Sequence, residues 1–165
     1  MKIPVLHLED GFHQFSFNIP AGTLQFSGSE VYPEEIITDV EVNKYEKNIQ
    51  CRVDIKTMAH YTCDRCLDQF VAPHHQIFEL LFHVGTADFE TEEEDVVFLK
   101  PETVEINLVN WLIEYLILAI PMKNICKVDC KGICSGCGAE LNRENCTCPP
   151  PRGDSRWEKL KDLIK

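Results

Sequence analysis

The sequence predicts an α+β protein in which an antiparallel β-sheet, or a partly open barrel, packs on a central apolar helix. Two observations support this class: apolar and polar residues alternate across a turn at 36–58, and one long apolar segment lies at 108–119. A third feature is a concentration of cysteines between positions 126 and 148. We therefore expect an acidic sheet-and-helix body over residues 1–122, and a cysteine-rich module with a short terminal helix over residues 123–165.

The first part of the chain contains two weaker strand patterns. Aromatic and aliphatic residues alternate with polar ones over 13–19, which predicts a strand. A second short strand is expected within 23–31, with a bend at Gly28.

The clearest strand signal is a pair of alternating segments, 36–45 and 49–58, separated by a turn at 46–48. In the second segment the apolar residues share one face, and the polar and charged residues share the other. This pattern predicts an antiparallel hairpin with one face in a core and one in water. Cys51 falls on the apolar face, so we interpret it as a small core residue.

A C-x-x-C motif, Cys63 to Cys66, follows this hairpin, and another extended segment follows at 69–82. Pro73 within that segment is compatible with an edge or a bulge. We expect the motif to cap a β-hairpin, so that both sulfur atoms project from one tight turn. The acidic segment 88–95 is interpreted as a solvated loop, with a contact for a basic partner or a divalent-cation site as alternatives.

The last elements before the cysteine-rich region are a strand at 96–99 and a helix at 108–119. Asn107 is the expected N-cap, and Pro121 stops the helix. Because the segment is apolar on most faces, we predict a central helix covered by the sheet. A last short helix is expected within 154–165, packing back on the body, with a partner-binding helix as the alternative.

Cysteine density of this kind has two common causes, a disulfide framework in a secreted chain or metal ligation in a reducing compartment. Glu9 and Asp10 end the first apolar stretch, and no secretory signal is recognisable. No stretch reaches the roughly 20 apolar residues of a membrane span. We therefore predict a cytoplasmic protein without a membrane segment, whose paired cysteines bind metal, with disulfide or redox chemistry as the alternative.

Eight of the nine cysteines come in close pairs, which is the number needed for two sites of four. The strongest group joins a C-x-x-C-G motif to a later C-x-C pair, and consists of Cys134, Cys137, Cys146 and Cys148. Four thiolates close a tetrahedral Zn²⁺ site and leave no position for a catalytic water, so we predict structural zinc. If the tail folds back beside the hairpin, the other four paired cysteines make another four-cysteine centre, which consists of Cys63, Cys66, Cys126 and Cys130.

The grouping of Cys63 and Cys66 with Cys126 and Cys130 leaves alternatives open, because Cys66 and Cys126 lie 60 positions apart. A crossed pairing among all eight cysteines, or a metal-free reduced pair at Cys63 and Cys66, would also fit the spacing. Another four-cysteine combination is Cys126, Cys130, Cys134 and Cys137. Histidines that could compete as ligands are His60, His74 and His75.

The formal net charge of −11 is spread unevenly along the chain. Residues 123–165 carry nine Lys/Arg and six Asp/Glu, so residues 1–122 carry a net charge of −14. An acidic body repels phosphate backbones and suits basic partners, whereas a slightly basic tail can touch RNA. Because a zinc ion held by four thiolates carries about −2, two such centres offset the basic tail. The charge therefore favours a basic protein partner over RNA.

Four motifs occur in a fixed order along the chain. They are Cys63-x-Arg65-Cys66-Leu67, then Cys126-x-x-x-Cys130-Lys131-Gly132-Ile133-Cys134-x-x-Cys137-Gly138-x-x-Leu141-Asn142, then Cys146-x-Cys148, and finally Asp154-x-Arg156-Trp157-x-x-Leu160. This order resembles the YceD family of bacterial and plastid proteins. Ser155 departs from the family pattern, which commonly has Pro there. Some members of the family lack the C-terminal cysteines, which makes the zinc module an accessory.

The resemblance implies a role in the accumulation of large-subunit (23S-type) ribosomal RNA. We predict a non-enzymatic ribosome-biogenesis factor that binds ribosomal RNA or a basic large-subunit ribosomal protein, and no small-molecule substrate. The residues proposed for RNA or partner contact are Arg65, Lys131, Arg143, Arg152 and Arg156. The alternatives are a zinc-stabilised interaction module of another pathway, and a nuclease or thiol oxidoreductase. An enzyme is disfavoured because the acidic segment is local and no C-x-x-C opens an obvious helix.

Overall fold

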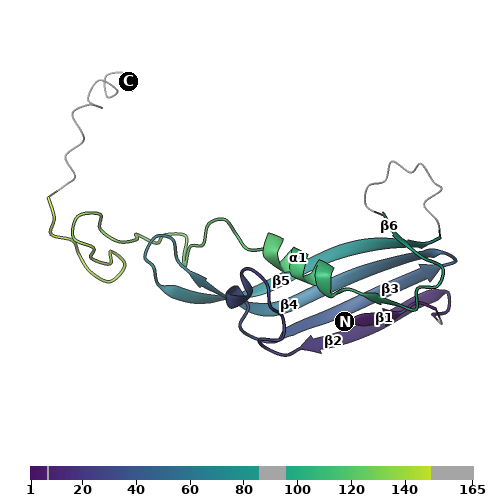
Figure 1. Cartoon of the computed structure of the whole chain (residues 1–165). Helices are drawn as coiled ribbons and strands as arrows, with labels where there is room; N and C mark the ends of the chain where they lie inside the picture. Colours follow the sequence, from purple (N-terminus) through teal and green to yellow (C-terminus); the bar gives the residue numbers. More distant parts are fainter. Residues whose placement is uncertain (7, 86–95, 150–165) are drawn as a thin grey trace, which may run out of the picture. The chain divides into compact units, whose positions relative to one another are not determined.

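The computed structural model describes residues 1–6, 8–85 and 96–149 (Figure 1). Two compact units are present: Met1–Tyr61 joins Phe70–Met122, and Thr62–Gln69 joins the described residues from Lys123 onward. The loop with the first C-x-x-C motif therefore groups with the C-terminal cysteines. The acidic segment 88–95 and the expected terminal helix lie outside the described residues.

The first unit is built on a five-stranded sheet in the order β2-β3-β4-β5-β6. Its strands are Gly11–Ile19 (β2), Ile36–Tyr45 (β3), Asn48–Thr62 (β4), Gln69–Val84 (β5) and Val96–Leu99 (β6). β2, β3 and β4 pair antiparallel, with Val40 opposite both Phe15 and Val53, whereas β6 runs parallel to β5. The predicted strands at 13–19, 36–45, 49–58, 69–82 and 96–99 are confirmed.

The strand expected within 23–31 is wrong. Ser29–Val31 forms a short 3₁₀ helix (η1) instead, directly after Gly28. Gly28 has φ 95°, a left-handed conformation that breaks an extended chain. A Cβ atom at this position would lie 2.7 Å from Cδ1 of Ile120, so a larger residue would also force the Ile120 side chain to shift. The other two strands, Lys2–Pro4 (β1) and Glu105–Asn107 (β7), form a separate antiparallel pair.

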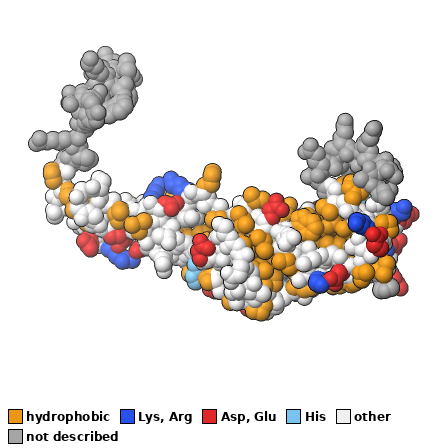
Figure 2. Space-filling model, in the orientation of Figure 1, with side chains coloured by type: hydrophobic (Ala, Val, Ile, Leu, Met, Phe, Trp, Pro, Cys, Tyr) orange, Lys and Arg blue, Asp and Glu red, His pale blue; other side chains and the backbone are white. Residues whose placement is uncertain are grey.

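The α-helix of the described residues is α1, Val109–Leu118, which lies across one face of the sheet (Figure 1). Its N-cap residue is Leu108, one residue later than predicted, but Oδ1 of Asn107 still accepts a hydrogen bond from the Val109 N–H at 3.1 Å. Apolar side chains are visible on the side of the first unit that carries α1, where Ile117 and Leu118 are exposed (Figure 2). The structure is thus mostly sheet with one described α-helix, and the finer prediction of a central helix or a barrel stays a prediction.

The core of the first unit lies between the sheet and α1. Phe78 stacks on Tyr115 with ring centroids 4.0 Å apart, and Phe82 meets Trp111 edge to face at 5.4 Å. Cys51 is fully buried in this core, and burial raises the pKa of its thiol to about 12, which confirms its interpretation as a core residue. None of the helices in the described residues has the length and apolar character that a membrane crossing requires.

Candidate metal centres

The second unit brings together four cysteines from distant parts of the sequence, which we call the first centre. They are Cys63, Cys66, Cys126 and Cys130, and their sulfur atoms all lie within 4.8 Å of one another. The sulfur atoms of Cys63 and Cys130 are 3.8 Å apart, and those of Cys66 and Cys126 are 3.6 Å apart. A tetrahedral metal site with bonds of about 2.3 Å requires sulfur atoms about 3.8 Å apart. The spacing therefore fits a four-coordinate ion.

The loop between β4 and β5 presents the first two of these cysteines. Within it, the N–H of Cys63 donates to the Asp68 carbonyl at 2.8 Å, and the N–H of Leu67 donates to the Cys63 carbonyl at 2.9 Å. Leu67 has φ 63°, an uncommon conformation for a branched residue, which reverses the chain directly after Cys66. The predicted hairpin cap is confirmed, and both sulfur atoms are held on one tight turn.

A reciprocal pair of hydrogen bonds holds the distant segment beside this loop. The N–H of Asp64 donates to the Asn124 carbonyl at 2.8 Å, and the Asp64 carboxylate accepts from the Asn124 N–H at 2.6 Å. Because Cys126 follows two positions later, this contact places it next to Cys66. The segment from 124 onward therefore folds back beside the loop, which is what the sequence required for the first centre to form.

A further junction joins the Cys66 turn to the Cys130 segment. The guanidinium of Arg65 donates to the Cys130 carbonyl at 2.9 Å, and the Ile133 N–H donates to the Arg65 carbonyl at 3.1 Å. Gly132 lies at the closest approach, with φ 75°, and a Cβ atom there would be 2.9 Å from the Arg65 carbonyl oxygen. Glycine is required at this position for both conformational and steric reasons.

The remaining four paired cysteines form the second centre, and their sulfur atoms also lie within 4.8 Å of one another: Cys134, Cys137, Cys146 and Cys148. Cys146 Sγ lies 3.6 Å from Cys137 Sγ and 3.2 Å from Cys134 Sγ. The turn closes through a hydrogen bond from the Gly138 N–H to the Cys134 carbonyl at 2.9 Å, with Gly138 at φ 75°. These distances are also compatible with one tetrahedral ion.

Backbone N–H groups point at the sulfur atoms, as expected for thiolate ligands. Hydrogen bonds from the backbone of Cys137 and Gly136 lower the pKa of Cys134 to about 6. Hydrogen bonds to the neighbouring thiols of Cys137 and Cys146 raise the pKa of Cys148 to about 12. One thiolate thus forms readily, while its neighbours oppose further ionisation. A divalent cation removes that opposition.

The two centres differ in exposure. In the first centre Cys63, Cys66 and Cys130 are buried, with 0%, 5% and 4% of their surface exposed. In the second centre Cys137 and Cys148 are exposed. Solvent and small reagents therefore reach the second centre more easily than the first.

A third set of potential ligands combines Cys66, Asp68 and Glu140. Cys66 already belongs to the first centre. The two carboxylates bind the guanidinium of Arg143, at 3.0 Å for Asp68 and 2.8 Å for Glu140. Since an arginine occupies the cation position, this set is better described as an ion-pair network.

The histidines considered as competing ligands lie elsewhere. His60 is 2.9 Å from Glu34, His75 is 3.0 Å from Asp54, and His74 packs edge to face on Tyr32. None of the three belongs to the ligand groups found among the described residues.

The predicted RNA or partner contacts have different surroundings. Arg65, Lys131 and Arg143 are exposed. The guanidinium of Arg65 donates to the Cys130 carbonyl, and that of Arg143 donates to the Asp68 carboxylate. Arg152 and Arg156 lie outside the described residues. Sequence reasoning assigned no role to Asn142, whose amide contacts the sulfur of Cys130 at 3.4 Å. Its place in the motif that carries the family resemblance was the available signal.

Comparison with known proteins gives matches across most of the chain. Residues 51–164 match the family described as "Large ribosomal RNA subunit accumulation protein YceD". The chain is 26% identical over 160 residues to the chloroplastic large ribosomal RNA subunit accumulation protein YCED homolog 1 of Arabidopsis thaliana, covering 80% of this chain and 50% of that protein. It is 33% identical over 108 residues to an uncharacterized protein of Mycobacterium bovis, covering 62% of this chain and 49% of that protein.

An uncharacterized protein of Mycobacterium leprae is 28% identical over 128 residues, covering 76% of this chain and 58% of that protein. The chain therefore spans about half the length of the curated relatives that it matches. No solved structure matches it.

Proposed function

The chain belongs to the YceD family, and from this premise we propose that it is a non-enzymatic ribosome-biogenesis factor that binds a basic large-subunit ribosomal protein and carries two structural zinc ions. Family membership supports a role in ribosome biogenesis, since the matched family is named for accumulation of the large ribosomal RNA subunit. The observation that carries the zinc part is the pair of four-cysteine centres. The choice of a basic protein as the partner rests on the negative charge of residues 1–122.

The ligand set favours zinc and a structural role. Four sulfur ligands in tetrahedral spacing suit Zn²⁺ or iron, whereas carboxylate-rich sites suit magnesium or calcium. A closed set of four protein ligands leaves no position for a substrate or an activated water. The metal therefore holds the second unit together, and no hydrolytic or redox step is assigned to it.

Elemental analysis of the purified chain tests the metal directly. We expect about two zinc ions per chain, because each four-cysteine centre holds one tetrahedral ion. Iron in the same ratio would leave the centres in place but change the metal. Fewer than about one ion of any metal per chain contradicts the metal proposal as a whole.

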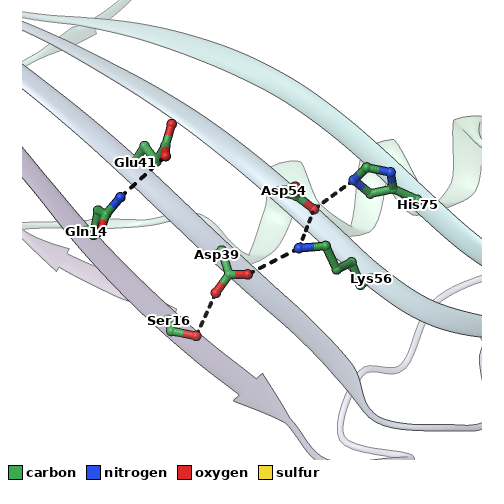
Figure 3. A network of polar contacts seen from close by, with 7 residues as sticks. All are labelled: Gln14, Ser16, Asp39, Glu41, Asp54, Lys56 and His75. Carbon is green, nitrogen blue, oxygen red and sulfur yellow. Dashed lines mark hydrogen bonds and ion pairs between the residues drawn. The ribbon is translucent and has the colours of Figure 1, made fainter.

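The face of the sheet opposite α1 carries a polar network that supports a basic partner (Figure 3). Asp39 and Asp54 lie opposite each other on β3 and β4, and the Lys56 amine is 3.5 Å from both carboxylates. Ser16 donates to Asp39 at 2.8 Å, and the Gln14 amide donates to Glu41 at 3.4 Å. The carboxylates of this network lie on the neighbouring strands β3 and β4, and the polar groups of β2 contact two of them.

Carboxylates outnumber cations on this face. In the described strands the acidic side chains there are Asp39, Glu41, Asp54 and Glu79, and the Lys and Arg side chains are Arg52 and Lys56. Glu41 and Glu79 also line a recess of about 660 Å³, together with the exposed ring of Phe12 and with Arg52, whose guanidinium lies 2.9 Å from the Glu79 carboxylate. Such a surface attracts basic side chains and repels phosphate groups.

A binding experiment separates the protein partner from RNA. The chain is titrated with labelled basic ribosomal proteins of the large subunit and, separately, with fragments of large-subunit ribosomal RNA. We expect salt-dependent binding of a basic protein, weakened roughly tenfold or more by the double substitution Glu41→Lys and Glu79→Lys. The matched control is Gln50→Lys, which adds a positive charge at the same recess without removing a carboxylate.

RNA binding is the second candidate, supported by the exposed cations of the second unit. Binding of RNA fragments alone, abolished by charge reversal of the exposed Lys131, would replace the protein partner with RNA. Equal binding of the wild-type chain and the Glu41/Glu79 double variant to basic proteins would contradict the role of the sheet face.

A further inference from the structure

Asn142 belongs to the loop of the second centre but contacts the first. It lies between Cys137 and Cys146, which are both ligands of the second centre. Its Nδ2 donates to the sulfur of Cys130 at 3.4 Å, and its Oδ1 accepts from the Lys131 N–H at 2.9 Å. The oxygen and the nitrogen of this amide therefore both bind Cys130 and Lys131, the segment that supplies a ligand to the first centre.

The position of Asn142 is fixed by short backbone contacts. The Leu141 N–H donates to the Gly132 carbonyl at 2.9 Å, and Ile133 forms an antiparallel bridge with Glu140. The Cys134 N–H donates to the Ala139 carbonyl at 2.8 Å, which ties the same ladder to a ligand of the second centre. The loop that closes around the second metal thus also sets the distance of Asn142 from Cys130.

Hydrogen bonds to ligand atoms change metal affinity. An N–H donated to a metal-bound thiolate stabilises its negative charge and restricts its orientation, and loss of such a partner typically costs about 10- to 100-fold in affinity. Asn142 donates such a bond to Cys130, which is 4% exposed and therefore has few water molecules that could replace the amide. The contribution of the amide to the first centre is expected to be large for a single hydrogen bond.

We infer that Asn142 is a positioning residue that couples the two centres, so that metal binding at the second centre increases the affinity of the first. The second metal orders the loop between Cys137 and Cys146, and the ordered loop presents its amide to Cys130. By the reciprocity of linked equilibria, metal at the first centre must increase the affinity of the second by the same factor. This inference rests on the proposed metal binding by both centres.

The test measures occupancy of each centre separately as free Zn²⁺ is buffered over a range of concentrations. Protection of cysteines from alkylation, read by mass spectrometry for peptides with Cys66 or with Cys137, gives the two binding curves. Asn142→Ala is expected to weaken the first centre by about 10- to 100-fold. The control Asn145→Ala removes an exposed amide of the same loop and is expected to leave the first centre unchanged.

A conservative variant distinguishes the sulfur contact from a scaffold role. Asn142→Asp keeps an oxygen to accept from the Lys131 N–H but has no N–H for Cys130. We expect it to weaken the first centre at least as much as Asn142→Ala does, because it also places a carboxylate beside the sulfur atoms. Wild-type affinity in Asn142→Asp would show that only the backbone contact matters and would overturn the inference.

Removal of the second centre tests the coupling itself. The double variant Cys137→Ser with Cys146→Ser is expected to weaken the first centre by a similar factor, and Asn142→Ala should then add little. Additive effects, or an unchanged first centre, would refute coupling through Asn142. If the wild-type protein and Asn142→Ala bind two ions equally well, only the coupling is refuted. If the wild-type protein binds no metal, the proposed zinc centres are refuted.

Discussion

Treatment with a strong zinc chelator is expected to unfold the second unit and leave the first unit folded. The described buried residues of the second unit are mainly ligands: Cys63, Cys66 and Cys130, with Gly132 beside them. A unit of this kind has too little apolar surface to offset the conformational entropy of its loops. In small zinc-stabilised domains the ion supplies about 10–16 kcal/mol of apparent free energy at neutral pH, so its loss removes the folded state.

Hydrogen exchange resolved by peptide measures both units in one experiment. After chelation, peptides from 62–69 and 123–149 should lose protection, while those from 36–58 should keep theirs. The core beneath β3 and β4 consists of apolar residues such as Val40, Val53 and Ile55, none of which needs metal to pack. Addition of excess Zn²⁺ serves as the control and should restore the lost protection. Simultaneous loss of protection at 36–58 would show that both units depend on metal.

The strands could be predicted where one face is buried and the other is in water. β3 and β4 show this pattern clearly, and the prediction placed Cys51 on the correct side. The prediction for 23–31 was wrong because its residues favour an extended chain locally, whereas Gly28 takes a left-handed conformation and Ser29–Val31 forms a 3₁₀ helix. The parallel pairing of β6 with β5 is a non-local property that alternation cannot indicate.

The second centre could be predicted because its ligands lie within one short segment, where spacing limits which sulfur atoms can meet. The first centre could not be settled in this way. Its geometry depends on hydrogen bonds between Asp64 and Asn124, which lie 60 positions apart and carry no recognisable signal. The contact of Asn142 with Cys130 depends on the register of the bridge between Ile133 and Glu140, which the sequence does not specify.

Phe82→Ala is expected to destabilise the first unit by about 3–5 kcal/mol, the usual cost of truncating a fully buried aromatic side chain. Phe82 lies in β5 with none of its surface exposed, and its ring meets the indole of Trp111 edge to face at 5.4 Å. The substitution removes the aromatic contact and leaves a cavity between the sheet and α1. A domain with a total stability of about 5–15 kcal/mol would lose a large part of it.

Urea unfolding followed by far-ultraviolet circular dichroism measures this loss as a lower midpoint with an unchanged slope. Phe12→Ala is the matched control, because Phe12 lies in β2 of the same sheet with 84% of its surface exposed, and its truncation should cost about 0.5 kcal/mol or less. Zinc content should stay the same in both variants, because both rings belong to the first unit and the cysteines of the two centres belong to the second. Equal destabilisation by the two substitutions would contradict the placement of Phe82 in the core, since only a buried ring leaves a cavity when it is removed.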